Sequence, residues 1–127
     1  MSIERILHRG APTPRGPYSS AVRGGDFIFL SSLGPVDDND QYSFGDIQQQ
    51  TRQTLLNLKK ILDDCEARLE DVVKCSIFLR DASEFSKMNE VYAEFFGDDK
   101  PARSTIVCGF AADIQVEIDC VAYKPRG

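Results

Sequence analysis

Residues 114–123, IQVEIDCVAY, alternate between two kinds of side chain, and this alternation decides how the rest of the chain packs. Consecutive residues of a strand point to opposite faces of a sheet. One face of this strand carries Ile114, Val116, Ile118, Cys120 and Ala122. We expect that face to pack on helices. Glu117, on the other face, then points away from the core, toward solvent or another subunit.

Two segments before this strand have the apolar spacing of amphipathic helices. One covers residues 46–68, and the other covers residues 85–96 and ends at Gly97, a residue suited to helix termination. A capping box is indicated at each start, by Asp46 with Gln49 and by Asp81 with Glu84. In the first helix, the face that packs on the sheet is expected to include Leu69.

Short apolar or alternating runs predict the remaining strands. They cover residues 3–7, 19–23, 26–32, 72–79 and 105–110. The dipeptide Gly24-Gly25 favours a tight hairpin turn between the second and third of these strands. The order of strands, helix, strand, helix and strands predicts a single α+β domain over residues 1–127, with one mixed sheet and two helices on one face. Because the other face carries Val121 and Tyr123, we expect it to meet a partner subunit.

Composition narrows the classes of function. The net charge is -5 with a pI near 4.8, and no lysine or arginine cluster is present, so a nucleic-acid partner is not expected. The four cysteines include no C-x-x-C pair and His8 is the only histidine, so no metal site is expected. The cysteines are interpreted as reduced core residues of a cytoplasmic protein. No apolar run indicates a signal peptide or a membrane span.

The stretch PARST, residues 101–105, contains the most informative candidate for binding. A proline stiffens the approach to Arg103, whose guanidinium is a permanently charged fork suited to a carboxylate. Glu117 is the acidic group that could accompany it. If the two side chains share a pocket, the protein can anchor an acid and activate a water molecule beside it.

Five stretches together resemble the Rid family, also called YjgF or reactive intermediate deaminases. They are residues 16–22 (GPYSSAV), 26–31 (DFIFLS), 85–96 (FSKMNEVYAEFF), 101–105 (PARST) and 116–118 (VEI). They span nearly the whole chain in the order of the family. The resemblance implies a chorismate-mutase-like fold and a homotrimer whose sheets form an inner barrel, with a ligand cleft at each subunit interface.

The resemblance also implies a reaction. Many members hydrolyse enamines and imines, such as 2-aminoacrylate, to 2-keto acids and ammonia without a cofactor or metal. By the family motifs, Arg103 matches the residue that binds the substrate carboxylate, and Glu117 matches the residue that positions water. The remaining positions expected to contact substrate are Tyr18, Ser31, Asn89 and Thr105, the last of which is a cysteine in many members.

Two departures from the family pattern border the expected cleft. The usual Ser-Gly-Gln is Ser-Ser-Leu at residues 31–33, and residues 110–113 replace a leucine-proline turn. These differences leave open a deaminase of longer substrates such as 2-aminomuconate. A third reading is a non-catalytic trimer that binds keto acids or amino acids. Ribonuclease activity, described for some relatives, is disfavoured by the acidic charge and the lack of a histidine pair.

Overall fold

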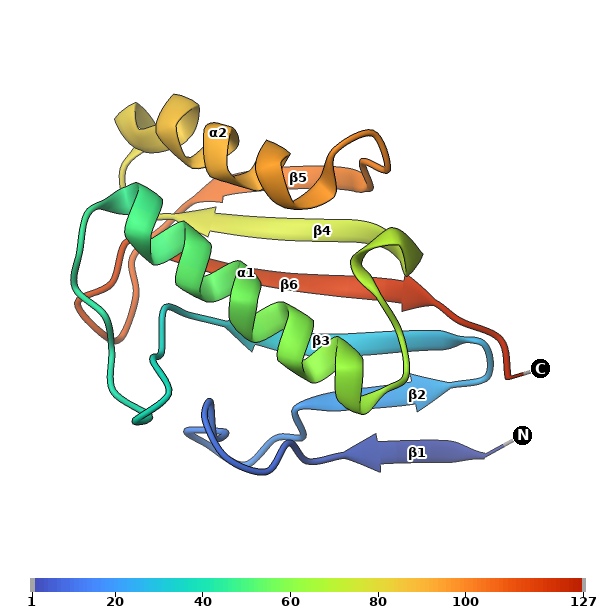
Figure 1. The fold of residues 1–127 in the computed structure, drawn as a ribbon. Coiled ribbons are helices and arrows are strands. Elements are labelled where there is room, and N and C mark those ends of the chain that lie inside the picture. The colour runs from blue at the N-terminus through green and yellow to red at the C-terminus, as the bar shows by residue number, and fades with distance from the viewer. Residues whose placement is uncertain (1, 127) are drawn as a thin grey trace.

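A computed structural model describes residues 2–126, and Figure 1 shows its six-stranded sheet with two long helices. The strands are β1 (Ile3–Ile6), β2 (Ala21–Gly24), β3 (Phe27–Leu33), β4 (Val72–Leu79), β5 (Ala102–Val107) and β6 (Val116–Tyr123). The helices are α1 (Ile47–Asp64) and α2 (Phe85–Phe96), with short 3-10 helices η1 (Leu69–Asp71) and η2 (Ala82–Glu84). The strand order is β1-β2-β3-β6-β4-β5, and only the β4–β5 pair is parallel.

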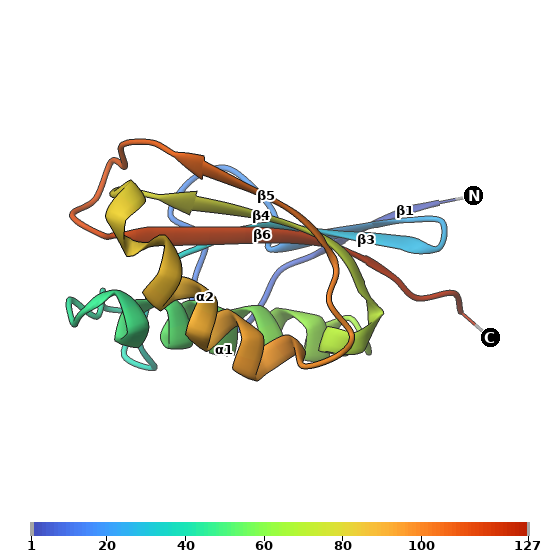
Figure 2. The same cartoon turned by 90° about the horizontal axis from the view of Figure 1, so that it is seen from above.

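Both helices cover the same face of the sheet, as Figure 2 shows from above. The expected inward face of β6 is confirmed, because Val116, Ile118, Cys120 and Ala122 are all buried. These side chains join one continuous core with the inner faces of α1 and α2. The mixed α+β fold with two helices on one face is therefore confirmed.

Three local predictions hold in detail. Gly25 adopts φ 62° in the turn between β2 and β3, a conformation that glycine reaches without steric cost. At the start of α1, Asp46 and Gln49 form both hydrogen bonds of a capping box. Gly97 ends α2 with φ 55°, and its amide donates to Ala93 O.

The boundaries of two elements were wrong by at least three residues, and the other differences are of one or two residues. Helix α1 ends at Asp64 and not at residue 68, because Glu66 takes a left-handed φ of 58° and Leu69 lies in η1 instead. Strand β5 runs from Ala102 to Val107 and not over residues 105–110, because the residues that pair with β4 are Ala102–Val107. Pairing with a distant strand does not show in the local periodicity of the sequence.

The second capping box is also corrected. Asp81 accepts a hydrogen bond from Ser83 N and so caps η2, the 3-10 turn before α2. Glu84 is the residue before α2, and its side chain makes no capping hydrogen bond. Asp81 does cap a helix, but that helix is η2, which the sequence pattern did not separate from α2.

The face of the sheet opposite the helices has no covering layer in the described chain. Large apolar side chains lie exposed along it, on strands β1, β3, β5 and β6: Ile3, Phe27, Phe29, Ile106 and Tyr123. The rings of Phe27 and Tyr123 lie 5.2 Å apart between centroids. Among residues 2–126, neither helix has the length and apolar character needed to span a bilayer.

Candidate active site

Arg103 lies on the edge strand β5, on the face that the helices cover. Its register partner on β4 is Cys75, a fully buried core residue, and side chains at the same level of adjacent strands share a face. The Arg103 guanidinium carbon lies 4.8 Å from the centroid of the Tyr92 ring and 5.5 Å from that of Phe85. Two aromatic faces from α2 thus hold the guanidinium by cation–π contact, which leaves its N–H edge able to bind an anion.

A cavity of about 290 Å³ opens beside Arg103, bordered by Asn89, Tyr92 and Lys100. Asn89 Oδ1 is buried and has no hydrogen-bond partner among residues 2–126, whereas the buried Tyr92 hydroxyl lies against the Cys75 thiol. Burial raises the pKa of Tyr92, so this group stays a neutral phenol. An unpaired buried acceptor is costly, and it is the kind of group that a ligand or a second chain satisfies.

Glu117 borders a different cavity, of about 190 Å³, which it shares with Tyr18, Ser32, Gly34 and Tyr42. Loss of solvation in this half-buried position raises the pKa of the Glu117 carboxyl. A carboxylate with a raised pKa is a better base than an exposed one. The cavity is large enough for a small organic acid or for its reacting end.

Tyr18 is placed by the proline-rich loop between β1 and β2. Its amide donates to Gly16 O (2.9 Å), and its hydroxyl accepts from the Arg15 amide (3.1 Å). Gly16 makes room for this turn, because a Cβ there would lie only 3.2 Å from the Tyr18 ring. The loop fixes the tyrosine at the mouth of the Glu117 cavity.

The structure does not bring Arg103 and Glu117 together within one chain. Glu117 pairs with Phe78 of β4, whereas Arg103 is level with Cys75, three residues earlier in that strand. The two residues are therefore about 10 Å apart along the strands and about 10 Å apart across them, and they point to opposite faces. The shared pocket that the sequence suggested is absent from the single chain described by residues 2–126.

The other predicted residues divide in the same way. Asn89 lies with Arg103, and Tyr18 lies with Glu117. Ser31 borders neither of these two cavities. Its hydroxyl donates to Ser19 O (2.7 Å) and so joins β3 to the segment just before β2. Thr105 is level with Ile77 on the helix side of β5, and it too borders neither cavity.

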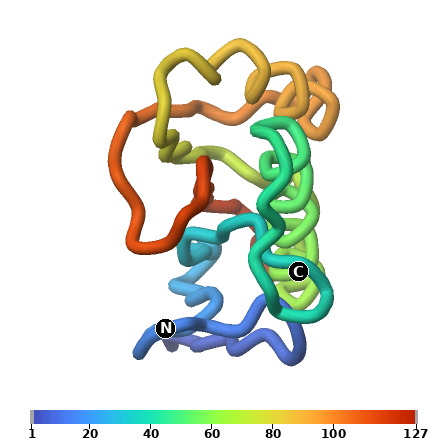
Figure 3. Tube along the Cα trace, turned by 90° about the vertical axis from the view of Figure 1, so that its left-hand side faces the viewer, coloured from blue at the N-terminus to red at the C-terminus, as the bar shows by residue number. Residues whose placement is uncertain are grey.

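Sequence reasoning missed several residues that border the two cavities. Lys100 directly precedes the PARST stretch and borders the Arg103 cavity. Arg15 lies in the same proline-rich loop as Tyr18 and borders the Glu117 cavity. In the sequence, only their closeness to these motifs could have indicated them. Gly34 and Tyr42 come from the loop after β3, where the sequence carries no periodic pattern. The loops that hold this cavity gather at one end of the sheet, the end that faces the viewer in Figure 3.

The thiols offer no competing chemistry at the Arg103 cavity. All four cysteines are free, and burial raises the pKa of Cys75 to about 11. A buried thiol with so high a pKa is a poor nucleophile. Within residues 2–126, no group of three or more His, Cys, Asp or Glu side chains is placed to hold a metal ion.

Comparisons with known proteins show the family to which this chain belongs. The family model described as "Endoribonuclease L-PSP" matches residues 8–124. A RutC family protein of Pyrococcus abyssi is 43% identical over 98% of this chain and 99% of its own. The 3-aminoacrylate deaminase RutC of Acinetobacter baylyi is 38% identical over 97% and 99% of the two chains.

A solved structure supports the same assignment. The crystal structure of E. coli TdcF with bound serine superimposes with a TM-score of 0.88 at 31% identity, over 95% of this chain and 99% of that one. The fold and the sequence together define a member of the YjgF/L-PSP class. The chain belongs to the Rid family, as its resemblance indicated.

Proposed function

We propose that this protein hydrolyses reactive enamines and imines of the 2-aminoacrylate type to 2-keto acids and ammonia. The observation that carries the proposal is the division of the site: Arg103 and Glu117 occupy two open half-sites on opposite faces of one sheet. A relative of this chain, RutC of A. baylyi, is named as a 3-aminoacrylate deaminase, and TdcF was crystallised with serine. Both names support a small amino or imino acid as the ligand.

The proposed roles follow from the chemistry of the side chains. Arg103 binds the substrate carboxylate with its N–H edge and cannot act as a base at neutral pH. Asn89 Oδ1, which has no partner among the described residues, accepts a hydrogen bond from the substrate nitrogen. Glu117 orients a water molecule and takes one of its protons. Tyr18 closes the cavity around the reacting carbon.

In the proposed reaction, an enamine first takes a proton from solvent on its β-carbon and becomes the iminium ion, the protonated form of the imine. Water then adds to the carbon of the C=N bond while Glu117 takes one proton of that water, which gives a neutral carbinolamine. The nitrogen receives that proton, the C–N bond breaks, and ammonia leaves as the hydroxyl group releases its proton to solvent and the C=O bond forms. One water is consumed, and no redox step occurs. Orientation supplies most of what this reaction needs.

We further propose that a second copy of the chain completes each site, in a homotrimer packed through the uncovered sheet face. The exposed apolar side chains of that face, including Phe29 and Ile106, support this arrangement. In a cyclic assembly, the Arg103 half-site of one subunit meets the Glu117 half-site of the next. The free thiols are compatible with a reducing compartment such as the cytoplasm.

The first test generates 2-aminoacrylate in situ with a serine dehydratase and follows pyruvate and ammonia. We expect the wild type to accelerate their release over buffer and Arg103→Ala to lose on the order of 100-fold in rate. Arg68→Ala removes an exposed arginine that pairs with Glu70 far from both half-sites, so it serves as the matched control. Lack of acceleration by the wild type would exclude the deaminase, and binding of pyruvate without turnover would favour a keto-acid-binding regulator.

The second test asks whether each site is shared between subunits. Arg103→Ala and Glu117→Gln chains with different tags are co-expressed, and assemblies carrying both tags are purified. In a mixed ring of three, one interface joins an intact Arg103 to an intact Glu117, so about a third of the wild-type rate returns. A mixed assembly as inactive as its two parents would place both residues in sites formed by one chain.

A ribonuclease role, which the description of the family model names, has less support in the site. His8 is the only histidine, and its two ring nitrogens lie against Asp64 Oδ2 and Ala11 O. Phosphodiester cleavage by a histidine pair is therefore not available to this chain. Its net charge of -5 also disfavours an RNA partner.

A further inference from the structure

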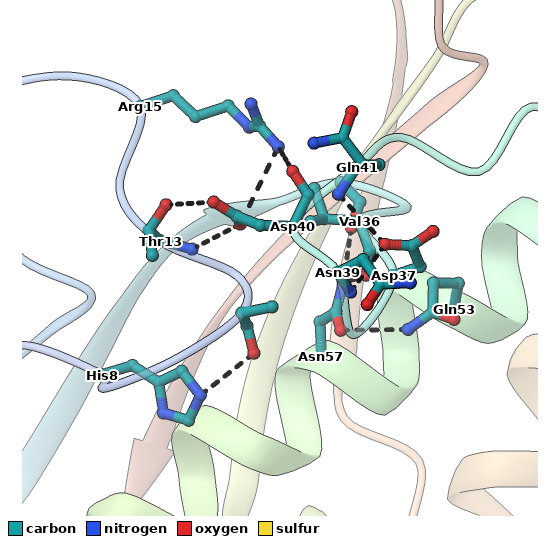
Figure 4. A network of polar contacts seen from close by, with 12 residues as sticks. His8, Thr13, Arg15, Val36, Asp37, Asn39, Asp40, Gln41, Gln53 and Asn57 are labelled. Carbon is teal, nitrogen blue, oxygen red and sulfur yellow. Dashed lines mark hydrogen bonds and ion pairs between the residues drawn. The ribbon is translucent and has the colours of Figure 1, made fainter.

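A cation borders the Glu117 cavity that neither the proposed reaction nor the family motifs require. It is Arg15, on the loop that also carries Tyr18. Figure 4 shows its guanidinium beside the loop that contains Asp40. The side chain is 40% exposed, so its charged end is accessible from solvent.

Two contacts hold the Arg15 guanidinium in place and leave most of its N–H donors without a partner among residues 2–126. Its Nη2 donates to Asp40 O (2.7 Å), and its carbon lies 4.5 Å from the centroid of the Tyr42 ring. This is its one hydrogen bond among residues 2–126, and a guanidinium has five N–H donors. Four donors stay available to a ligand, although the charge is shared with the Asp40 carboxylate.

The nearest carboxylate is occupied by other partners. Asp40 accepts hydrogen bonds from the Thr13 amide (3.0 Å) and the Thr13 hydroxyl (2.6 Å), and these bonds lower the pKa of Asp40. Its carboxylate Oδ1 lies 3.9 Å from Arg15 Nη2, an ion-pair contact that is longer than a hydrogen bond. Asp40 thus holds the two loops together, and the single hydrogen bond to its carbonyl oxygen leaves four of the five Arg15 N–H donors unused.

Side chains of helix α1 hold the loop after β3 in place by hydrogen bonds. The buried amide of Asn57 donates to Gly34 O (2.9 Å) and Val36 O (2.8 Å), and Gln53 donates to Asn57 Oδ1 (3.1 Å). Asp37 Oδ1 then accepts from two amides of the turn that leads to Asp40. Figure 4 shows this chain of contacts from α1 to Arg15. The guanidinium is therefore positioned before any ligand arrives.

We propose that Arg15 is a specificity residue that binds a second acidic group at the far end of the substrate. The inference rests on the proposed deaminase function and narrows it to imines and enamines of dicarboxylic acids. In this arrangement Arg103 holds the carboxylate next to the reacting carbon, and Arg15 holds the distal carboxylate. Without Arg15, Glu117 would be the one charged side chain among residues 2–126 bordering this cavity, and it would repel a second anion.

The test compares two imines of equal length. An amino-acid oxidase acting on glutamate supplies 2-iminoglutarate, and one acting on norvaline supplies 2-iminopentanoate. Semicarbazide traps the free imine, so a fall in semicarbazone reports hydrolysis. Arg15→Gln keeps much of the side-chain length but removes the charge, Arg15→Lys keeps the charge, and Arg68→Gln is the control on an exposed surface arginine.

We expect the ratio of kcat/KM for 2-iminoglutarate to that for 2-iminopentanoate to fall about tenfold in Arg15→Gln, as for the loss of one charge-assisted hydrogen bond. Arg15→Lys restores part of the ratio, and Arg68→Gln leaves it at the wild-type value. An unchanged ratio in Arg15→Gln overturns the inference.

A binding measurement separates this inference from the proposed reaction. Calorimetry compares 2-oxoglutarate with 2-oxopentanoate, which differ only in the distal carboxylate. If the wild type turns over neither imine, the deaminase proposal fails, and Arg15-dependent preference for 2-oxoglutarate still upholds the inference. Equal binding of the two keto acids by the wild type overturns it.

Discussion

Glu117 shows how the fold changes the behaviour of a single residue. The outward row of β6 places its carboxyl in a half-buried cavity, where weaker solvation raises its pKa above the ordinary value of a glutamate. The same side chain on an open sheet would be an ordinary solvated acid. Its proposed role as a base therefore depends on the loops that close over it.

The raised pKa of Glu117 predicts a pH-dependent effect on stability. Protonated Glu117 is favoured in the folded state, so its contribution is full below the unfolded pKa and is lost as pH rises through the folded pKa. Glu117→Gln cannot ionise, so it should have a higher free energy of unfolding than the wild type near neutral pH. The two proteins should converge below about pH 4.

Urea denaturation over a range of pH measures this difference. Glu70→Gln changes an exposed glutamate and serves as the control. A stability gain of Glu117→Gln that stayed constant with pH, or that grew toward acid, would contradict the burial of the carboxyl.

The sequence could predict the residue types of the site but not their arrangement. Arg103 follows from a stiff approach and a fork suited to carboxylates, and the outward face of Glu117 follows from strand alternation. Their separation onto opposite faces depends on β5 pairing beside β4, a contact between distant segments. Arg15 could not be found by pattern, because its position depends on a loop that folds against it from residue 40.

At the scale of elements, the start of α1 organises the loops around the Glu117 cavity. The buried side chain of Gln50 donates to Gly45 O (2.9 Å) and accepts from the Gln115 amide (2.8 Å). It thus joins the loop before α1 to the segment that enters β6. A shift of the helix start would move both segments, and with them the wall of the cavity.

The capping box at this helix start predicts a measurable contribution. Asp46 accepts from the Gln49 amide (2.9 Å), and Gln49 Oε1 accepts from the Asp46 amide (2.9 Å). Asp46→Ala should lower the free energy of unfolding by about 1 kcal/mol, because the first turn loses its acceptor. Asp46→Asn keeps an acceptor and should lose much less. Equal losses in the two variants, measured by denaturant unfolding, would show that the cap does not set the helix start.

Local signals in the sequence predicted this helix start, but they did not predict its end. The Asp46 cap involves residues within one turn, so a short motif contains all of it. The end at Asp64 depends on a left-handed Glu66, a conformation that no glycine or asparagine marks in the sequence. This turn buries Ala67. The apolar spacing of the sequence, taken alone, predicted a helix that continues past the turn.

At the scale of the molecule, one layer of helices and one sheet leave the other face of the sheet without a covering layer among residues 2–126. Figure 2 shows both helices on the same side, and the far side carries the exposed rings of Phe27, Phe29 and Tyr123. The half-sites add a second reason for assembly, since Arg103 and Glu117 can act on one substrate only if two chains meet. The same face would then supply both stability and a complete site.

This dependence predicts that one charge on the sheet face disrupts both assembly and activity. Phe29 is 49% exposed in the centre of that face, and Phe29→Glu would bury an unpaired carboxylate in the proposed interface. We expect sedimentation velocity to show monomers, and circular dichroism to show an unchanged fold. Deaminase activity should fall with the loss of assembly, because each chain retains only half-sites.

Leu56→Glu provides the matched control, since Leu56 is 40% exposed on α1, a helix on the covered side of the sheet. It should keep the assembly and the activity of the wild type. If Phe29→Glu remained a trimer, the interface would lie elsewhere. If it became an active monomer, Arg103 and Glu117 could not be partners across subunits, and the mixed-chain experiment should then fail as well. Agreement between these two independent measurements would establish that assembly creates the site.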